Sequence, residues 1–185
     1  MYIEIEAKLK VESFKGIEKR LKALDAEFLR ERLHTDAYFD DAKSSLCKSD
    51  SALRLRHQLI GKRDQVVITF KGPRREGRFK QRQEIQFEVR DGWLAEMFLE
   101  AIGYKKTIVY QKKRRAWHYG DCEVALDELP FLGKFVEIEG PGEKKIADVQ
   151  KKLGLEDLPH IHHSYAVMMA KELRRRRRKN NRVFF

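Results

Sequence analysis

Apolar and charged residues alternate strictly from Ile3 to Lys10, near the start of the chain. On a β-strand, successive side chains point to opposite faces, so Ile3 and Ile5 share one face. Glu4, Glu6 and Lys8 share the other face. Two carboxylates and an ammonium on one strand face can hold a divalent cation beside a phosphate, although a simply solvated charged face would show the same local pattern.

The same alternation recurs downstream and predicts eight strands. Short turns between neighbouring segments favour an antiparallel sheet, and Gly72-Pro73 and Gly120-Asp121 are expected to end strands. Eight long strands with one polar face favour closure into a barrel over an open sheet with exposed edges. The predicted strands cover residues 2–11, 27–39, 52–60, 65–71, 81–90, 104–119, 122–128 and 134–139.

Four segments have helical spacing of apolar residues. Ser13 is expected to cap a helix that extends to about residue 25. Helices over 93–102 and 144–153 would end at Gly103 and Gly154, and a last helix would run from about Ser164 into the arginines. These helices can cover the apolar strand faces from outside. The predicted fold is therefore α+β, a closed eight-stranded antiparallel β-barrel with helices packed outside and a charged tunnel inside.

The composition of the 185-residue chain fits one folded domain, with 42% hydrophobic residues and no apolar run long enough to span a membrane. Cys47 and Cys122 form no metal-type spacing, and no signal peptide is recognisable, so a cytoplasmic protein is expected.

Residues 171–182 hold eight basic residues and one acid, which accounts for +7 of the net charge of +11. We therefore divide the chain into a body, 1–170, and a basic tail, 171–185. The tail is expected to be solvated, and contact with RNA, DNA or an anionic surface is the alternative.

Charged residues of both signs inside one barrel are costly unless ions and ligands satisfy them. Arginine and lysine suit phosphate oxygens, whereas carboxylates suit Mg²⁺ or Mn²⁺, which often bridge to substrate phosphates. The motifs that carry this chemistry resemble those of the CYTH family, the triphosphate tunnel metalloenzymes, and most of all its class IV adenylyl cyclase branch. They occur in order as Glu4-x-Glu6-x-Lys8, Tyr38-Phe39-Asp40, Ala52-Leu-Arg54-Leu-Arg56, Thr69-Phe-Lys71-Gly72-Pro73, Arg82-x-Glu84, Lys112-Lys-Arg114, Leu126-Asp127-Glu128, Leu132-Gly133-x-Phe135-x-Glu137-Ile-Glu139 and Ser164-Tyr165.

The resemblance implies a tunnel that binds the triphosphate of a small-molecule substrate together with Mg²⁺ or Mn²⁺. It implies three groups of site residues. Metal would be held by Glu4, Glu6 and either Glu137 or Glu139. Phosphate would be bound by Lys8, Arg54, Arg56, Lys71, Lys112 and Arg114. The catalytic residues would be Asp127, Glu84 and Lys71.

Two departures from the family pattern bear on the reaction. Gln86 stands where an acid is common, which removes a charge from the tunnel. The class IV signature also includes a His-Phe pair upstream of the first strand, and the sequence has no such pair before Glu4. The missing pair disfavours cyclase activity, and the sequence shows no pocket that would read a base, so we expect hydrolysis of tripolyphosphate or of a nucleoside or thiamine triphosphate. Cyclisation of ATP to cyclic AMP and pyrophosphate is the first alternative, and a non-catalytic module that binds polyphosphate or RNA is the second. Helices outside a barrel also leave room for a homodimer.

Overall fold

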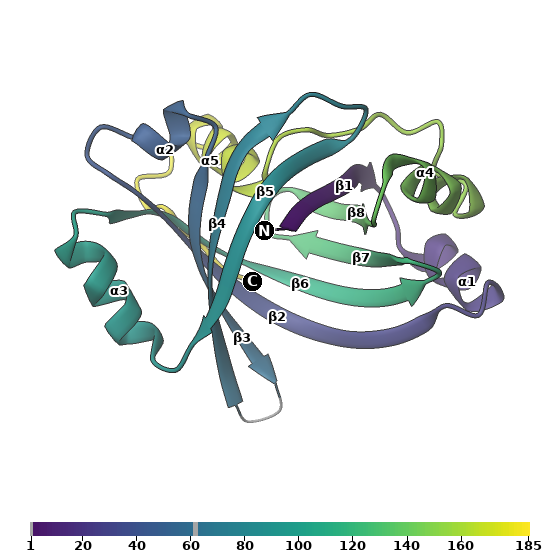
Figure 1. The fold of residues 1–185 in the computed structure, drawn as a ribbon, viewed down its shortest axis with the longest axis horizontal. Helices are drawn as coiled ribbons and strands as arrows, with labels where there is room; N and C mark the ends of the chain where they lie inside the picture. Colours follow the sequence, from purple (N-terminus) through teal and green to yellow (C-terminus); the bar gives the residue numbers. More distant parts are fainter. Residues whose placement is uncertain (1, 61–62) are drawn as a thin grey trace.

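The protein forms a closed barrel of eight antiparallel strands (Figure 1). The computed structural model describes residues 2–60 and 63–185. Strands follow one another around the barrel in the order β2-β3-β4-β5-β1-β8-β7-β6, and pairing of β6 with β2 closes it. The strands are β1 (Tyr2–Val11), β2 (Glu27–Asp40), β3 (Ala52–Ile60), β4 (Arg63–Arg75), β5 (Lys80–Val89), β6 (Lys105–Tyr119), β7 (Cys122–Leu129) and β8 (Gly133–Glu139).

The helices lie around this barrel, as the sequence predicts. They are α1 (Lys15–Ala23), the short α2 (Ser45–Lys48), α3 (Gly92–Ala101), α4 (Glu143–Lys152) and α5 (Tyr165–Arg175). Side chains begin two of them: Asp91 accepts hydrogen bonds from the first N–H groups of α3, and Ser164 accepts one from the backbone of Val167 in α5. None of the helices in the described parts of the chain is both long and apolar enough to cross a membrane.

Local details differ from the sequence prediction at four places. Phe14, not Ser13, is the residue at the start of α1, and the Ser13 hydroxyl instead accepts a hydrogen bond from the backbone of Lys15. The dipeptide Gly72-Pro73 does not end β4, because the strand continues to Arg75 through a register shift between Lys71 and Arg74. A β-bulge tolerates the proline that a regular ladder would reject. The sequence analysis also missed α2 and a short strand near the C-terminus.

The outer faces of the barrel carry two apolar cores. One lies between β1, β7, β8 and the helices α1 and α4, with Leu9, Ile17 and Ile146 at its centre. The other lies beneath α3 and includes Leu55 and Leu99. The alternation in each strand sends apolar residues to these cores and charged residues inward, because neighbouring side chains on a strand point to opposite faces.

The helix α5 packs across one end of the barrel and fills its interior there. Met169 and Leu173 of α5 contact an apolar cluster with Tyr110 and Phe135. The short strand β9 (Arg182–Val183) pairs in parallel with β6, and the buried Val183 joins the same cluster. We call this end the α5 end, and the opposite end, where Ile60 pairs with Arg63, the β3–β4 end.

Candidate active site

The barrel interior contains a cavity of about 590 Å³ lined by charged side chains of both signs. Every site residue predicted from the sequence lines it except Asp127. The basic side chains along its described walls are Lys8, Arg30, Arg54, Arg56, Lys71, Lys80, Lys112 and Arg114. The acidic ones are Glu4, Glu6, Asp36, Glu84, Asp121, Glu123, Glu137 and Glu139. The two lists are equal in length, so the lining is formally neutral.

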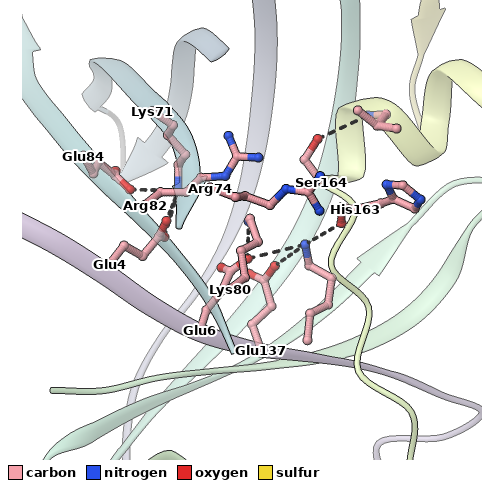
Figure 2. Close-up of polar contacts among 12 residues, drawn as sticks. Glu4, Glu6, Lys71, Arg74, Lys80, Arg82, Glu84, Glu137, His163 and Ser164 are labelled. Carbon is pink, nitrogen blue, oxygen red and sulfur yellow. Dashed lines mark hydrogen bonds and ion pairs between the residues drawn. The ribbon is translucent and has the colours of Figure 1, made fainter. Parts of the chain in front are cut away.

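Lys71 bridges two carboxylates from neighbouring strands (Figure 2). Its Nζ lies 2.6 Å from Glu4 Oε2 and 2.8 Å from Glu84 Oε2. Burial by itself would lower the pKa of Lys71, but the two carboxylates outweigh burial and raise it. The pKa of Glu84 is lowered in turn, since Lys71 offsets the cost of burying the carboxylate. Lys71 and Glu84 are therefore both charged at neutral pH.

A second bridged pair lies beside the first. The ammonium of Lys8 is 3.6 Å from Glu6 Oε1 and 3.2 Å from Glu137 Oε1, and it donates a hydrogen bond to the backbone carbonyl of His163. Lys80 also donates to Glu6 (Figure 2). Burial opposes the charge of Lys8, yet Glu6 and Glu137 raise its pKa above the ordinary value. Because β1 pairs with both β5 and β8, its inward face contributes to both groups, with Glu4 in the first and with Glu6 and Lys8 in the second.

Asp127 lies behind the cavity wall and holds two of the cations in place. It is fully buried and accepts hydrogen bonds from Arg114 at 2.7 and 2.5 Å and from Lys112 at 3.1 Å. Arg114 also donates to Glu137. Burial and the neighbouring Arg114 charge lower the pKa of Lys112 to about 8, although Asp127 opposes that shift. This placement gives Asp127 an orienting position, without direct access to the cavity.

The sequence analysis missed the interior face of β2. Asp36, which is 1% exposed, pairs with Arg56 through two hydrogen bonds of 2.6 and 2.8 Å. His34 is two residues away on the same face, and burial together with Arg56, Lys112 and other cations lowers the pKa of its imidazole. The signal was present, since charged and polar residues occupy every second position from Arg30 to Asp36. Tyr165, quoted only as part of a motif, also lines the cavity.

Three buried polar atoms that face the interior lack a hydrogen-bond partner within the described residues. They are Arg54 Nε, His34 Nδ1 and the Tyr165 hydroxyl. Burial raises the pKa of Tyr165 well above its usual value, so its hydroxyl stays a neutral donor. Unsatisfied buried polar groups cost stability, and each needs an explanation. A polar ligand in the cavity would provide partners for Arg54 and Tyr165, which both line it.

The carboxylates of the cavity fit a hard divalent cation in donor chemistry, since Mg²⁺ and Mn²⁺ prefer oxygen ligands. Glu4 and Glu84 are bridged by the Lys71 ammonium, and Glu6 and Glu137 by Lys8, so each pair of carboxylates already encloses a cation. Within the described ranges, no three metal-ligating side chains converge on one point. Metal binding would therefore require the lysines to move away from the carboxylates.

The closed antiparallel barrel with a charged interior defines the fold class, and comparisons with known proteins identify the family. The model of the CYTH domain matches residues 2–165. The chain belongs to the CYTH domain family.

The similar proteins share the fold over nearly their whole length. A candidate adenylate cyclase of Methanocaldococcus jannaschii is 28% identical over 150 residues, which is 81% of either chain. The solved structure of the Pyrococcus horikoshii protein PH1819 is 27% identical, with a TM-score of 0.77, and the match covers 95% of this chain and 99% of that one. The Hippeastrum protein HpAC1, described as having a dominant triphosphatase activity, shares the fold at 18% identity and a TM-score of 0.70 over 92% and 97%. Proteins with this fold are thus described both as cyclases and as a triphosphatase.

Proposed function

We propose that the protein is a divalent-metal-dependent triphosphatase that binds its substrate in the charged cavity of the barrel. The observation that carries this proposal is the neutral lining of eight basic and eight acidic side chains. A triphosphate alone would add several negative charges to a low-dielectric interior. A triphosphate with divalent cations adds little net charge, because the cations and the lysines exchange partners.

The lysines have a defined role in that exchange. Glu4, Glu6 and Glu137 or Glu139 would hold the cation, and Lys71 and Lys8, which now pair with carboxylates of this set and with Glu84, would then be available to phosphate oxygens. The bound cation neutralises charge on phosphate oxygens and lowers the pKa of water in its coordination shell. Arg54, with its unsatisfied Nε, and the Tyr165 hydroxyl are preorganised donors for the same oxygens.

Arg114 and Lys112 would bind phosphate in orientations that the buried Asp127 fixes. Asp127 fixes the orientation of both cations, so they meet a phosphate chain without rearranging. Glu84 is the remaining acid near Lys71 and is charged at neutral pH, so it would orient an attacking water as a hydrogen-bond acceptor. The alternative reaction is attack of a ribose hydroxyl on the α-phosphorus, which would give cyclic AMP and pyrophosphate. The relative of Methanocaldococcus jannaschii supports that alternative through its description.

The deciding experiment offers ATP and inorganic tripolyphosphate in parallel, with Mg²⁺, with Mn²⁺ and with a chelator, and identifies products by chromatography. Metal-dependent release of orthophosphate supports the proposal. Cyclic AMP with pyrophosphate assigns the protein as a cyclase. Absence of product from both substrates under every condition would leave a binding module as the function.

The metal-ligand assignment has its own test. Glu4→Gln combined with Glu6→Gln should lower metal-dependent turnover by about two orders of magnitude or more, since the cation would lose two of its oxygens. Glu12→Gln is the matched control, because Glu12 lies on the exposed end of the same segment. Thermal unfolding of both variants shows whether the fold persists. Unchanged turnover in the folded double variant would refute the assignment.

Three further expectations stay predictions. They are a cytoplasmic location, a homodimer, and the division of the chain at residue 170. The helix α3 offers the surface for a second copy, because Trp93, Leu94, Met97, Phe98 and Ile102 are each about half exposed or more. Contiguous exposed apolar side chains of this kind often mark an interaction surface. Light scattering of the wild type and of a Trp93→Glu variant would show whether this face pairs two chains.

A further inference from the structure

The basic tail is exposed, but the chain returns to the barrel after it. The helix α5 ends at Arg175, the backbone adopts a positive φ of 52° at Arg177, and β9 then pairs with β6. Leu173 before the basic run and Val183 after it are only 3% and 2% exposed. The six consecutive basic residues 174–179 are therefore held at both ends by buried side chains.

The charges of this basic run are only partly neutralised. Glu172 pairs with Arg175 and with Arg176, and the N–O distance is 2.6 Å in each pair. Five other exposed cations form no ion pair within the described parts of the chain, namely Arg174, Arg177, Arg178, Lys179 and Arg182. Folding brings these like charges together at a cost in free energy, and a bound polyanion would offset that cost.

An exposed aromatic ring lies against two of the arginines. The guanidinium carbons of Arg176 and Arg178 are 4.4 and 5.8 Å from the centroid of the Phe131 ring. Phe131, in the turn between β7 and β8, is 41% exposed and has a φ of 65°, in the left-handed region that favours glycine. Burial compensates little of this backbone strain, because much of the ring is in contact with water. Strained positions of this kind cluster at functional sites.

A second exposed aromatic ring lies at the C-terminus. The strand β2 occupies one edge of β6 over nearly its whole length, so β7 and β9 share the other edge. Along that edge, β7 pairs with β6 from Lys113 onward, and β9 pairs just before that point. Phe185 lies between them: its N–H donates to Gln111 Oε1 at 3.3 Å, and its ring centroid is 4.2 Å from Lys113 Nζ. It is 51% exposed and is close to the turn that holds Phe131, because β7 leads into that turn here.

Cations without carboxylate partners beside exposed aromatic rings match the chemistry of a single-stranded nucleic acid. Arginine and lysine bind the backbone phosphates, whereas aromatic rings and guanidinium planes stack with bases that are unpaired. A duplex presents phosphates but keeps its bases inside the stack, so it would leave the phenylalanine rings without a partner.

We propose that the tail and the β7–β8 turn form a binding surface for single-stranded nucleic acid, which we call the tail surface. It comprises residues 174–179 together with Lys113, Phe131 and Phe185. The phosphates contact the cations that have no carboxylate partner, and bases stack beside the two phenylalanines. None of these residues lines the charged cavity, so the proposal is independent of the triphosphatase reaction.

The test measures the binding of a fluorescent RNA of about 20 nucleotides by anisotropy, alongside DNA of the same sequence and the corresponding DNA duplex. The oligonucleotides have 5′-hydroxyl ends, so that no triphosphate can enter the cavity. The wild type should bind the single strands more tightly than the duplex, although the duplex has the higher charge density. A preference between the RNA and the single-stranded DNA identifies which of the two the tail surface takes.

Two variants separate phosphate contacts from base stacking. The first removes three arginines that have no carboxylate partner, by Arg174→Gln, Arg177→Gln and Arg178→Gln. It should weaken single-strand binding at least tenfold and reduce the slope of log Kd against log salt by about 2, since three phosphate contacts are lost. The second, Phe131→Ala, should weaken binding about tenfold without changing the salt slope. The charge-matched control changes three exposed lysines of α1, by Lys15→Gln, Lys19→Gln and Lys22→Gln, and should alter Kd less than about twofold.

Several results would overturn the proposal. An equal loss in the arginine variant and the lysine control would show that net charge alone attracts the nucleic acid. Duplex binding as tight as single-strand binding, or an unchanged Kd in folded Phe131→Ala, would exclude stacking. Binding to anionic lipid vesicles but to no oligonucleotide would assign the tail surface to a membrane instead. Thermal unfolding checks each variant, and Phe131→Leu, which keeps an apolar side chain without the ring, replaces Phe131→Ala if that protein does not fold.

Discussion

The two ends of the barrel interior are built on the same strands and have opposite chemistry. On β6, Lys112 and Arg114 face the cavity, whereas Ile108 on the same strand face belongs to the apolar cluster at the α5 end. On β8 the change from charged to apolar takes place between Glu137 and Phe135, two residues apart. The strand pattern alone does not distinguish these ends. The α5 helix does, because it supplies apolar partners at one end only.

The two regions contribute differently to the stability of the fold. At the α5 end, burial of Phe135, Tyr110 and Met169 stabilises the fold in the usual way. In the charged part, each ion pair largely cancels its own desolvation cost, so pairing avoids a penalty without contributing much. A site that binds charged ligands is expected to contribute less to stability than an apolar core, because its side chains are selected for binding.

The largest expected effect is in the charged part. Arg56→Leu removes the partner of the buried Asp36 and should lower the free energy of unfolding by about 3–5 kcal/mol, since an unpaired carboxylate stays behind. Urea denaturation measures it. The matched double variant, Arg56→Leu with Asp36→Leu, removes both charges and should recover most of the loss. If the single and double variants are equally unstable, the pairing argument is wrong.

A smaller loss is expected at the α5 end. Met169→Ala leaves a cavity where α5 packs into the barrel and should cost about 2–4 kcal/mol in the same urea experiment. Val167→Ala on the exposed side of α5 is the control and should cost below about 1 kcal/mol. An equal effect of the two substitutions would show that α5 is not anchored in the barrel interior.

The affinity of the charged cavity for tripolyphosphate should depend on pH through Lys112. The pKa of Lys112 is about 8, so this residue loses its charge in the free protein as the pH rises through that value. Binding of tripolyphosphate then requires uptake of a proton, and affinity should fall by up to about tenfold per pH unit above 8. Lys112→Arg keeps the charge and should flatten the curve between pH 8 and 9.5. The same pH dependence in both proteins would contradict the assigned pKa.

The smallest effect is expected from the basic tail. Truncation near Lys171 would also remove Leu173 and Val183, which are buried at the α5 end, so substitution is the cleaner test. Changing the exposed Arg174, Arg175, Arg177 and Arg178 to glutamine should leave turnover within about twofold. Filter binding of single-stranded RNA at several salt concentrations tests the alternative function. If the tail binds nucleic acid, the substituted protein loses affinity and salt dependence.

Much of the site was predictable because strand alternation is a local property. The side chains of Glu4, Glu6 and Lys8 reach the interior simply because they occupy alternate positions of one strand. The alternation on β2 could have identified His34 and Asp36 in the same way. By contrast, Asp127 shares the inward parity of β7, and nothing local indicates that Arg114 and Lys112 separate it from the cavity.

The sequence by itself determined the barrel, the inward direction of the charges and the family, since each follows from period, residue type and order along the chain. Only the tertiary structure decided that Lys71 bridges Glu4 and Glu84, and that α5 fills one end. It also decided that a second hollow beside the charged cavity combines arginines with the uncharged Gln58 and Gln65. The physical reason is that pairing and enclosure depend on strand register and helix docking between residues far apart in sequence. Local periodicity contains no information about either.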